Sequence, residues 1–315
     1  MNRERAVAIG QTLTVLILMS LGTVITKIAL DDVAPMTFAW MSVAVGMVLL
    51  TLYTFVIKGE RIPSDLTRQV WMYIIIIGVF NFVIGRITMT ISLERLPATT
   101  NTYLVNFIGF ITMGMSIFML KESPTVFQVL GAIVAIFGLY IFFDEPPTGY
   151  EFVGILLILI GITAVAYTNN IARKLGIVTE NKLSNNIVST VALLIGGGLM
   201  VLIGLVVDGV PQVRGLGSWG AIIYAGIFMV AFGLTVWNHI LRVLRSYEAS
   251  ILGASTVIWT ALLAVPILGE RLSFNEIIGM VLMLVGLALV QVRRGKFSTL
   301  WQQLRLAVGG QSPSP

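Results

Sequence analysis

The chain has 315 residues, of which 57% are hydrophobic and only 11% are charged, with a formal net charge of +5. Soluble domains carry about 25% charged residues, so this composition excludes an ordinary soluble protein and indicates an integral membrane protein. The absence of cysteine further excludes disulfides and thiolate metal sites.

Ten apolar runs follow one another along the chain, and most approach the ~20 residues with which a helix crosses ~30 Å of hydrocarbon. They lack the alternation of barrel strands, so each is predicted to be a transmembrane helix. We number them as spans one to ten, over residues 6–30, 36–57, 70–93, 98–119, 124–143, 152–172, 184–207, 217–241, 248–268 and 274–292. The first run is long and lacks a clear cleavage site, which favours a retained helix over a signal peptide.

Lysine and arginine are distributed unequally between alternate loops. With the N-terminus placed in the cytoplasm, fifteen of the twenty lie in cytoplasmic segments, and only Arg95, Arg214 and Arg271 lie in opposite loops. Lys27 and Arg86 lie within spans. This asymmetry predicts that both termini are cytoplasmic. It also explains the basic charge through the anionic membrane surface, so no nucleic-acid partner is expected.

An internal repeat relates the two halves at a constant offset of 148 residues. Glu122 matches Glu270, and four of six glycines in 78–139 coincide with four of six in 226–287, where about 0.6 would coincide by chance. Because each copy has five spans, the second enters the membrane from the opposite side. We therefore predict an all-α membrane protein of ten transmembrane helices in two inverted five-helix repeats; the alternative is that duplication only enlarged a bundle. The predicted units are 1–143, 144–292, and a basic interfacial segment with a disordered tail over 293–315.

The C-terminal half resembles the second EamA domain of the drug/metabolite transporter superfamily. The matching features are Trp237-Asn238, the small-residue helix after them, Leu268-Gly269-Glu270-Arg271, and the helix with Gly279 and Gly286. Residues 70–142 resemble the first EamA domain. The resemblance implies ten helices, an inner-membrane location and export of amino acids, related metabolites or drugs. The chain departs from the family at Gly109 and Val257, where proline is usual, and it lacks the arginine often found after Pro35, which leaves the substrate group open.

Polar side chains within apolar spans are costly in lipid and normally face protein or a water-filled cavity, so they are candidate substrate-binding residues. In chain order they are Lys27, Asn81, Arg86, Tyr103, Asn106, Tyr167, Asn170, Trp237, Asn238 and Trp259. Lys27 shares a stripe with Ser20 and Thr23, but it could instead snorkel and complement its own helix C-terminus.

Structural alternatives exist for several of these candidates. Asn81 lies on a face of small residues that could serve close helix packing. Arg86 projects about 100° from that face, and it could pair with Glu94, face backbone carbonyls or bind an anionic substrate group. Asn106 could form an interhelical hydrogen bond. His239, the only histidine, is more typical of packing than of proton relay.

No aspartate or glutamate lies in the middle of a predicted span. A proton-coupled exporter of lipophilic cations needs an embedded carboxylate, so that function is disfavoured. The embedded cations Arg86 and Lys27 favour a substrate with a carboxylate or another anionic group. One histidine and no embedded carboxylate leave neither an acid–base pair nor a metal-ligand set, so we expect no enzyme activity, metal or cofactor.

These observations predict a secondary transporter of the bacterial inner membrane. We expect it to export a small metabolite, such as an amino acid or related carboxylate, by alternating access around a cavity lined by spans one, three, four, six, eight and nine. Arg86 would contact an anionic group, with Tyr103, Trp237 or Trp259 against an apolar part. Alternatives left open are an exporter of drugs or other xenobiotics and a non-transporting scaffold or receptor. Expected partners are a small-molecule substrate and membrane lipid, and a homodimer is left open.

Overall fold

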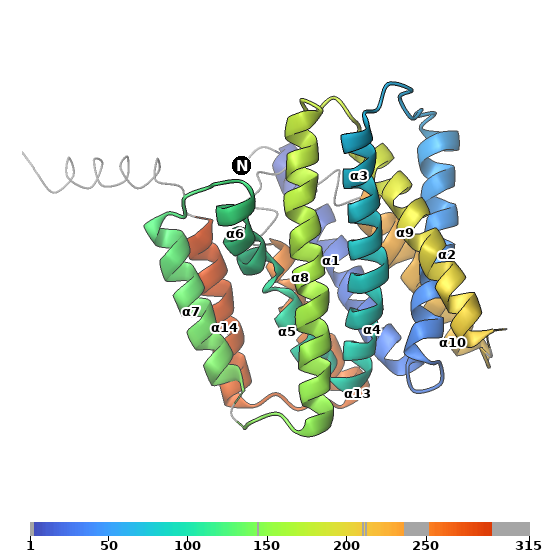
Figure 1. Cartoon of the computed structure of the whole chain (residues 1–315). Helices are drawn as coiled ribbons and strands as arrows, with labels where there is room; N and C mark the ends of the chain where they lie inside the picture. The colour runs from blue at the N-terminus through green and yellow to red at the C-terminus, as the bar shows by residue number, and fades with distance from the viewer. Residues whose placement is uncertain (1–2, 144, 210, 212, 236–251, 292–315) are drawn as a thin grey trace, which may run out of the picture.

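A computed structural model describes residues 3–143, 145–209, 211, 213–235 and 252–291. These residues form a bundle of helices and connecting turns, with no strand among them (Figure 1). In chain order the elements are α1 (Arg3–Ala29), α2 (Pro35–Thr51), η1 (Leu52–Ile57), α3 (Arg68–Ile77), η2 (Gly78–Gly85), α4 (Arg86–Arg95), α5 (Ala98–Val105), α6 (Ile108–Met119), α7 (Val126–Phe142), α8 (Gly149–Val178), α9 (Asn185–Asp208), α10 (Leu216–Tyr224), η3 (Ala225–Phe232), α13 (Thr256–Leu268) and α14 (Phe274–Val290), where η marks a π-helical segment.

Several of these elements join end to end into membrane-length helices. Seven stretches are long and apolar enough to cross a membrane: Gly10–Ala29, Pro35–Ile57, Arg68–Arg95, Ala98–Met119, Gly149–Val178, Asn185–Asp208 and Leu216–Thr235. Three further apolar helices are shorter, namely Val126–Phe142, Leu252–Leu268 and Phe274–Val290. The prediction of a multi-pass helical membrane protein is thus confirmed. The end of predicted span eight, the start of span nine and the tail over 293–315 lie outside the described residues.

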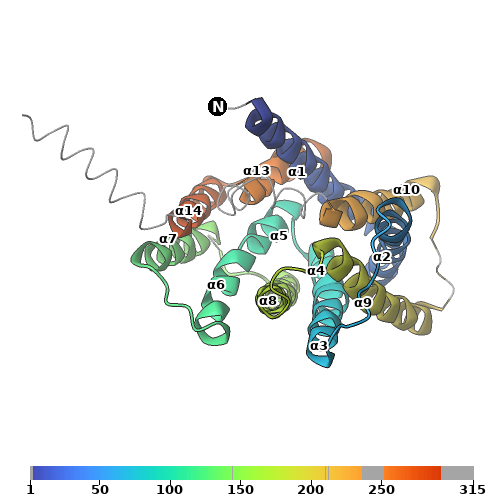
Figure 2. The ribbon, with the colours of Figure 1, turned by 90° about the horizontal axis from the view of Figure 1, so that it is seen from above.

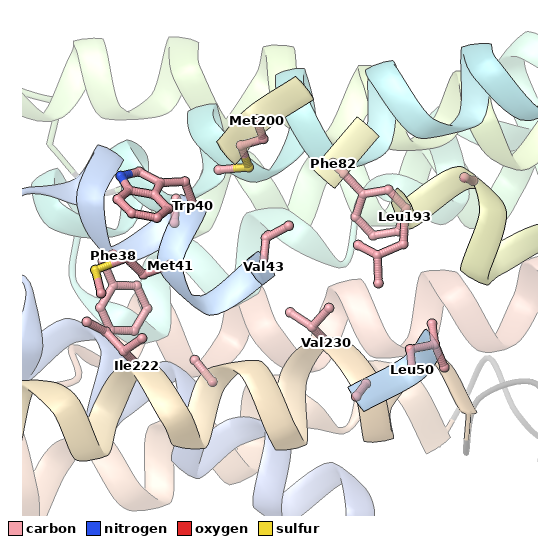
Figure 3. Close-up of a cluster of buried hydrophobic side chains, with 14 of the residues drawn as sticks. Phe38, Trp40, Met41, Val43, Leu50, Phe82, Leu193, Met200, Ile222 and Val230 are labelled. Atoms are coloured by element: carbon pink, nitrogen blue, oxygen red, sulfur yellow. The ribbon is translucent and has the colours of Figure 1, made fainter. Parts of the chain in front are cut away.

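The larger of two hydrophobic cores joins α2, α3, α9, α10 and η3 (Figure 3). Phe38 and Val43 of α2, Leu193 and Met200 of α9, and Ile222 of α10 are all completely buried there. Because lipid tails are as apolar as these side chains, close packing rather than exclusion of water holds such helices together. The core therefore holds α9 beside α3 and η2, and it holds α2 beside α10 and η3.

Local structure recurs at the offset of 148 residues. The π-helical segment η2 begins at Gly78, and its counterpart η3 begins at Ala225, one residue before the repeat-equivalent Gly226. Both α7 and α14 start with a capping box, in which the first residue and the residue three positions later satisfy each other's backbone N–H. These pairs are Thr125 with Gln128 and Ser273 with Glu276. Duplicated sequence has therefore produced duplicated local geometry.

The helices α7 and α14 pack side by side over glycines (Figures 1 and 2). A Cβ atom added to Gly279 would lie 2.7 Å from the carbonyl oxygen of Gly138, and one added to Gly138 would lie 3.0 Å from that of Gly279. Gly131 and Gly286 approach each other in the same reciprocal way. Only glycine permits this approach of two backbones, which explains why these four positions carry glycine in both halves of the sequence.

Candidate functional site

A cavity of about 280 Å³, with a mainly apolar surface and several polar side chains, lies between α1, α4, α5, η3 and α13, and we call it the polar cavity. Figure 2 shows α1, α13, α5 and α4 grouped around the middle of the bundle. The cavity is lined by Met19, Ser20, Thr23, Thr26, Arg86, Met89, Thr90, Leu93, Asn101, Thr102, Val105, Met229, Thr256 and Thr260. The predicted lining by spans one, three, four, eight and nine agrees with this set, whereas span six contributes no residue to it.

Arg86 is the cationic group of the polar cavity. It is the first residue of α4, directly after η2, and one of its Nη atoms donates to the hydroxyl of Ser42 on α2 at 3.2 Å. Its Nε is buried and has no hydrogen-bond partner among the described residues. Among the described residues no acidic side chain lines this cavity, so none of them supplies a counter-ion to the guanidinium there.

Hydroxyl groups form much of the remaining polar wall. Those of Thr26, Thr90 and Thr256 donate to backbone carbonyls one turn back in their own helices, at 2.7, 2.8 and 2.8 Å. Because each proton is used in this way, the hydroxyl oxygens can still accept hydrogen bonds. Thr260 is completely buried, and its hydroxyl has no partner among the described residues.

Methionines supply the apolar part of the wall. Met19 of α1, Met89 of α4 and Met229 of η3 all line the cavity. Methionine side chains are unbranched and polarisable, so they adapt to apolar groups of different shapes. The cavity thus presents a guanidinium, several hydroxyl oxygens and a flexible apolar surface.

Lys27 caps a helix other than its own. Its ammonium donates to three backbone carbonyl oxygens at the end of α4, those of Leu93, Glu94 and Leu96, at 2.8, 2.7 and 2.9 Å. An ammonium has three protons, so none remains for a substrate in this conformation. This contact differs from both alternatives that the sequence left open, which were its own helix C-terminus and a substrate.

Glu270 binds the other side of the same turn. Its carboxylate accepts hydrogen bonds from the backbone N–H groups of Ala98 and Thr99, at 2.5 and 3.1 Å. These groups open α5, where unpaired N–H donors and the helix dipole favour an anion. We call these contacts the Lys27–Glu270 clamp, because together they hold the α4–α5 turn beside the polar cavity.

Glu122, the repeat equivalent of Glu270, has different surroundings. Figure 1 shows its α6–α7 connection at the end of the bundle opposite the α13–α14 connection. The guanidinium of Arg173 binds both of its carboxylate oxygens, and this hydrogen bonding lowers the pKa of Glu122. The pair is about half exposed and borders a second cavity, of about 560 Å³, which Thr112, Ser116 and Gln128 also line.

Tyr103, Asn106 and Asn170 do not line the polar cavity. Tyr103 is completely buried, because its ring stacks on that of Phe142 with centroids 3.9 Å apart. Asn106 donates to a carbonyl of its own helix at 2.9 Å. Buried Asn170 donates to the carbonyl of Thr112 at 3.0 Å, an interhelical bond. These contacts engage the ring of Tyr103 and the amide N–H groups of Asn106 and Asn170 within the protein.

Of the remaining candidates, Asn81 is half-buried in η2 and does not line the polar cavity. Tyr167 of α8 lines an apolar groove beside Phe80 instead. Trp259 is half-buried between the lining residues of α13, with no partner for its indole N–H among the described residues. Trp237 and Asn238 lie outside the described residues.

Of the predicted site residues that the structure describes, Arg86 lines the polar cavity, whereas most of the hydroxyl and methionine lining was not predicted. The polar stripe of Ser20 and Thr23 on span one was a usable signal, because both residues line the cavity. Methionine in an apolar helix carries no such signal. Its position depends on how each helix is rotated in the bundle.

Comparison with known proteins identifies the relatives of this chain. The model of the EamA-like transporter family matches residues 7–143 and 172–292. An "uncharacterized transporter" of Archaeoglobus fulgidus is 21% identical over 85% of this chain and 92% of its own length. The "uncharacterized transporter YoaV" of Bacillus subtilis is 20% identical over 83% and 88%, respectively. A crystal structure with 16% identity superimposes with a TM-score of 0.61 over 90% of this chain and 96% of its own, which supports the fold alone.

Proposed function

The chain belongs to the EamA-like transporter family, and from this premise we propose that it exports a small metabolite, such as an amino acid or related carboxylate. The observation that carries the proposal is the guanidinium of Arg86 at a cavity where no described lining residue is acidic. An unbalanced cation in a poorly hydrated site attracts an anionic group far more strongly than it would in water. Arg86 is therefore the proposed contact for the substrate carboxylate.

Alternating access is the proposed mechanism, with 1–143 and 144–292 as two inverted five-helix repeats. Three observations support this arrangement: the paired π-helical segments, the paired capping boxes and the reciprocal glycine contacts between α7 and α14. A two-fold axis that brings one residue of the first half against a second residue of the other half also makes the reciprocal contact. The glycines follow this pattern, because Gly131 approaches Gly286 and Gly138 approaches Gly279. Two equivalent halves can pack in two ways, each open to one side of the membrane.

The proposed location is the bacterial inner membrane, with both termini in the cytoplasm. Lysine and arginine gather in the loops on one side, which supports this orientation. The chain has no cysteine, so single cysteines can report the side of each loop. Ser123→Cys should react with an impermeant maleimide only after the membrane is opened, whereas Arg271→Cys should react in intact cells. Labelling of both positions from one side would contradict the inverted arrangement.

Export is tested by metabolite analysis of cells that overexpress the protein. We expect one or a few carboxylates to accumulate in the medium with the wild-type chain and not with Arg86→Ala. Arg95→Ala is the matched control, because Arg95 lies on α4 against the ring of Tyr150 and does not line the polar cavity. Equal export by Arg86→Ala and the wild-type chain, at equal expression, would remove Arg86 from the substrate site.

A further inference from the structure

We propose that the polar cavity selects a monocarboxylate with an uncharged, mainly apolar body over a zwitterion, dicarboxylate or amine of similar shape. This inference rests on the proposed function and narrows its substrate class. It follows from the charge, the hydrogen-bonding groups and the size of the cavity.

The charge balance of the occupied cavity favours a single negative charge. Arg86 contributes one positive charge, and no other lining residue in the described part of the chain carries a charge. A buried charge is costly unless an opposite charge pairs with it. A monocarboxylate leaves the occupied site neutral. A zwitterion leaves one positive charge there, a dicarboxylate leaves one negative charge, and an amine adds a second positive charge.

The hydrogen-bonding groups of Arg86 fit a carboxylate. The Nε–H has no partner, and only one bond, to Ser42, is formed by the Nη atoms. A guanidinium offers five N–H donors, and an adjacent pair of them binds the two oxygens of a carboxylate in parallel. A carboxylate at the cavity face of Arg86 would thus bind Nη donors that the described residues leave unused.

The threonine hydroxyls do not replace a negative partner for an ammonium group. Their oxygens, on Thr26, Thr90 and Thr256, can accept hydrogen bonds, but they carry no formal charge. They can hold a water molecule or a hydroxyl of the substrate. An α-ammonium group placed there would keep its positive charge in the same cavity as Arg86, where the two charges repel each other.

The volume of the cavity limits the size of the substrate, and its methionines favour an apolar substrate body. An apolar cavity of about 150 Å³ holds benzene, with six carbon atoms. By that scale, the 280 Å³ of the polar cavity holds a molecule of about eleven non-hydrogen atoms. Met19, Met89 and Met229 would contact the apolar part.

The test uses four compounds that share a branched carbon chain and differ in charge. These are 4-methylpentanoate, leucine, isobutylmalonate and 3-methylbutylamine, titrated near pH 7, where carboxylates are ionised and amines are protonated. Binding to the purified full-length protein in detergent is measured by calorimetry and by the shift in its thermal unfolding. We expect 4-methylpentanoate to bind at least about tenfold more tightly than each of the other three compounds, which corresponds to about 1.4 kcal/mol.

Variants then connect this selectivity to Arg86. Arg86→Gln should weaken 4-methylpentanoate binding at least about tenfold and remove the preference over leucine. Arg86→Lys, which keeps the charge but loses the planar pair of donors, should retain the preference at lower affinity. Arg95→Gln is the control for a lost arginine on the same helix, and it should bind like the wild-type protein. Selectivity of the wild-type protein is informative even if Arg86→Gln does not fold.

The monocarboxylate assignment is overturned if leucine binds as tightly as 4-methylpentanoate, or if the acid does not bind at roughly 10 mM. Equal binding of the acid by folded Arg86→Gln and the wild-type protein also overturns it. None of these results removes the proposed function, because export of another carboxylate is measured separately in cells. Conversely, absence of export with intact monocarboxylate selectivity would contradict transport and leave the binding assignment in place.

Discussion

Glu270→Gln tests whether the Lys27–Glu270 clamp stabilises the fold. The carboxylate accepts two backbone hydrogen bonds at the start of α5, at 2.5 and 3.1 Å. Hydrogen bonds to a charged group contribute roughly 1.5–3 kcal/mol each. Glutamine keeps one acceptor oxygen, so the substitution removes one bond and the favourable charge at the helix N-terminus. We expect the free energy of unfolding to fall by about 2 kcal/mol.

The assay is unfolding in mixed micelles of increasing SDS content, followed by tryptophan fluorescence. Glu180→Gln is the matched control, because Glu180 pairs only with exposed Lys182, and such pairs contribute about 0–1 kcal/mol. Lys27→Met removes the donors on the other side of the turn, so its effect and that of Glu270→Gln should be non-additive by about 0.5–3 kcal/mol. If Glu270→Gln is no less stable than Glu180→Gln, the clamp does not stabilise the protein.

Three further substitutions test separate parts of the structure. Gly286→Ala should destabilise the α7–α14 contact by about 1–3 kcal/mol, whereas Gly114→Ala, which meets no atom within 4 Å, should be neutral or stabilising. The lowered pKa of Glu122 means that its pair with Arg173 stabilises the fold above the unfolded-state pKa of about 4.3 and loses this effect as pH falls through the lower folded-state value. Arg173→Gln should therefore unfold at lower SDS content near neutral pH, by up to about 1 kcal/mol, with the difference vanishing in acid. Thr260→Val should keep or raise stability in the same assay, since the hydroxyl it removes is unpaired; a loss above about 1 kcal/mol would indicate a missing partner.

The sequence was sufficient to predict the membrane class, and Arg86 is a candidate site residue that lines a cavity in the structure. Continuous apolar runs leave the backbone no alternative to helices in lipid. An arginine in such a run must reach a polar region or a partner, because an unpaired charge in lipid is costly. The repeat of Gly131 and Gly138 in Gly279 and Gly286 similarly marked the helices that the structure brings together over glycine.

The contacts of Lys27 and Tyr103 could not be predicted in the same way. Lys27 binds carbonyl oxygens 66 to 69 positions away in sequence, and no local pattern shows which helix end will lie beside it. Tyr103 and Asn106 lie on one helical face by spacing, but the approach of Phe142 on α7 decides that the tyrosine ring is enclosed. Helical periodicity predicts which residues share a face, whereas the neighbour of that face depends on the packing of the whole bundle.

The two repeat-equivalent glutamates show that the halves differ in detail. Glu270 is held within the protein by the start of α5, whereas Glu122 is about half exposed beside Arg173 and a cavity of about 560 Å³. The two repeat-equivalent glutamates thus differ in environment, because Glu270 binds backbone N–H groups whereas Glu122 is accessible. A carrier with two equivalent packings must have such a difference in each of its end states, because a fully symmetric arrangement would be open or closed at both ends together. The different surroundings of Glu122 and Glu270 are therefore of the kind that the proposed mechanism requires.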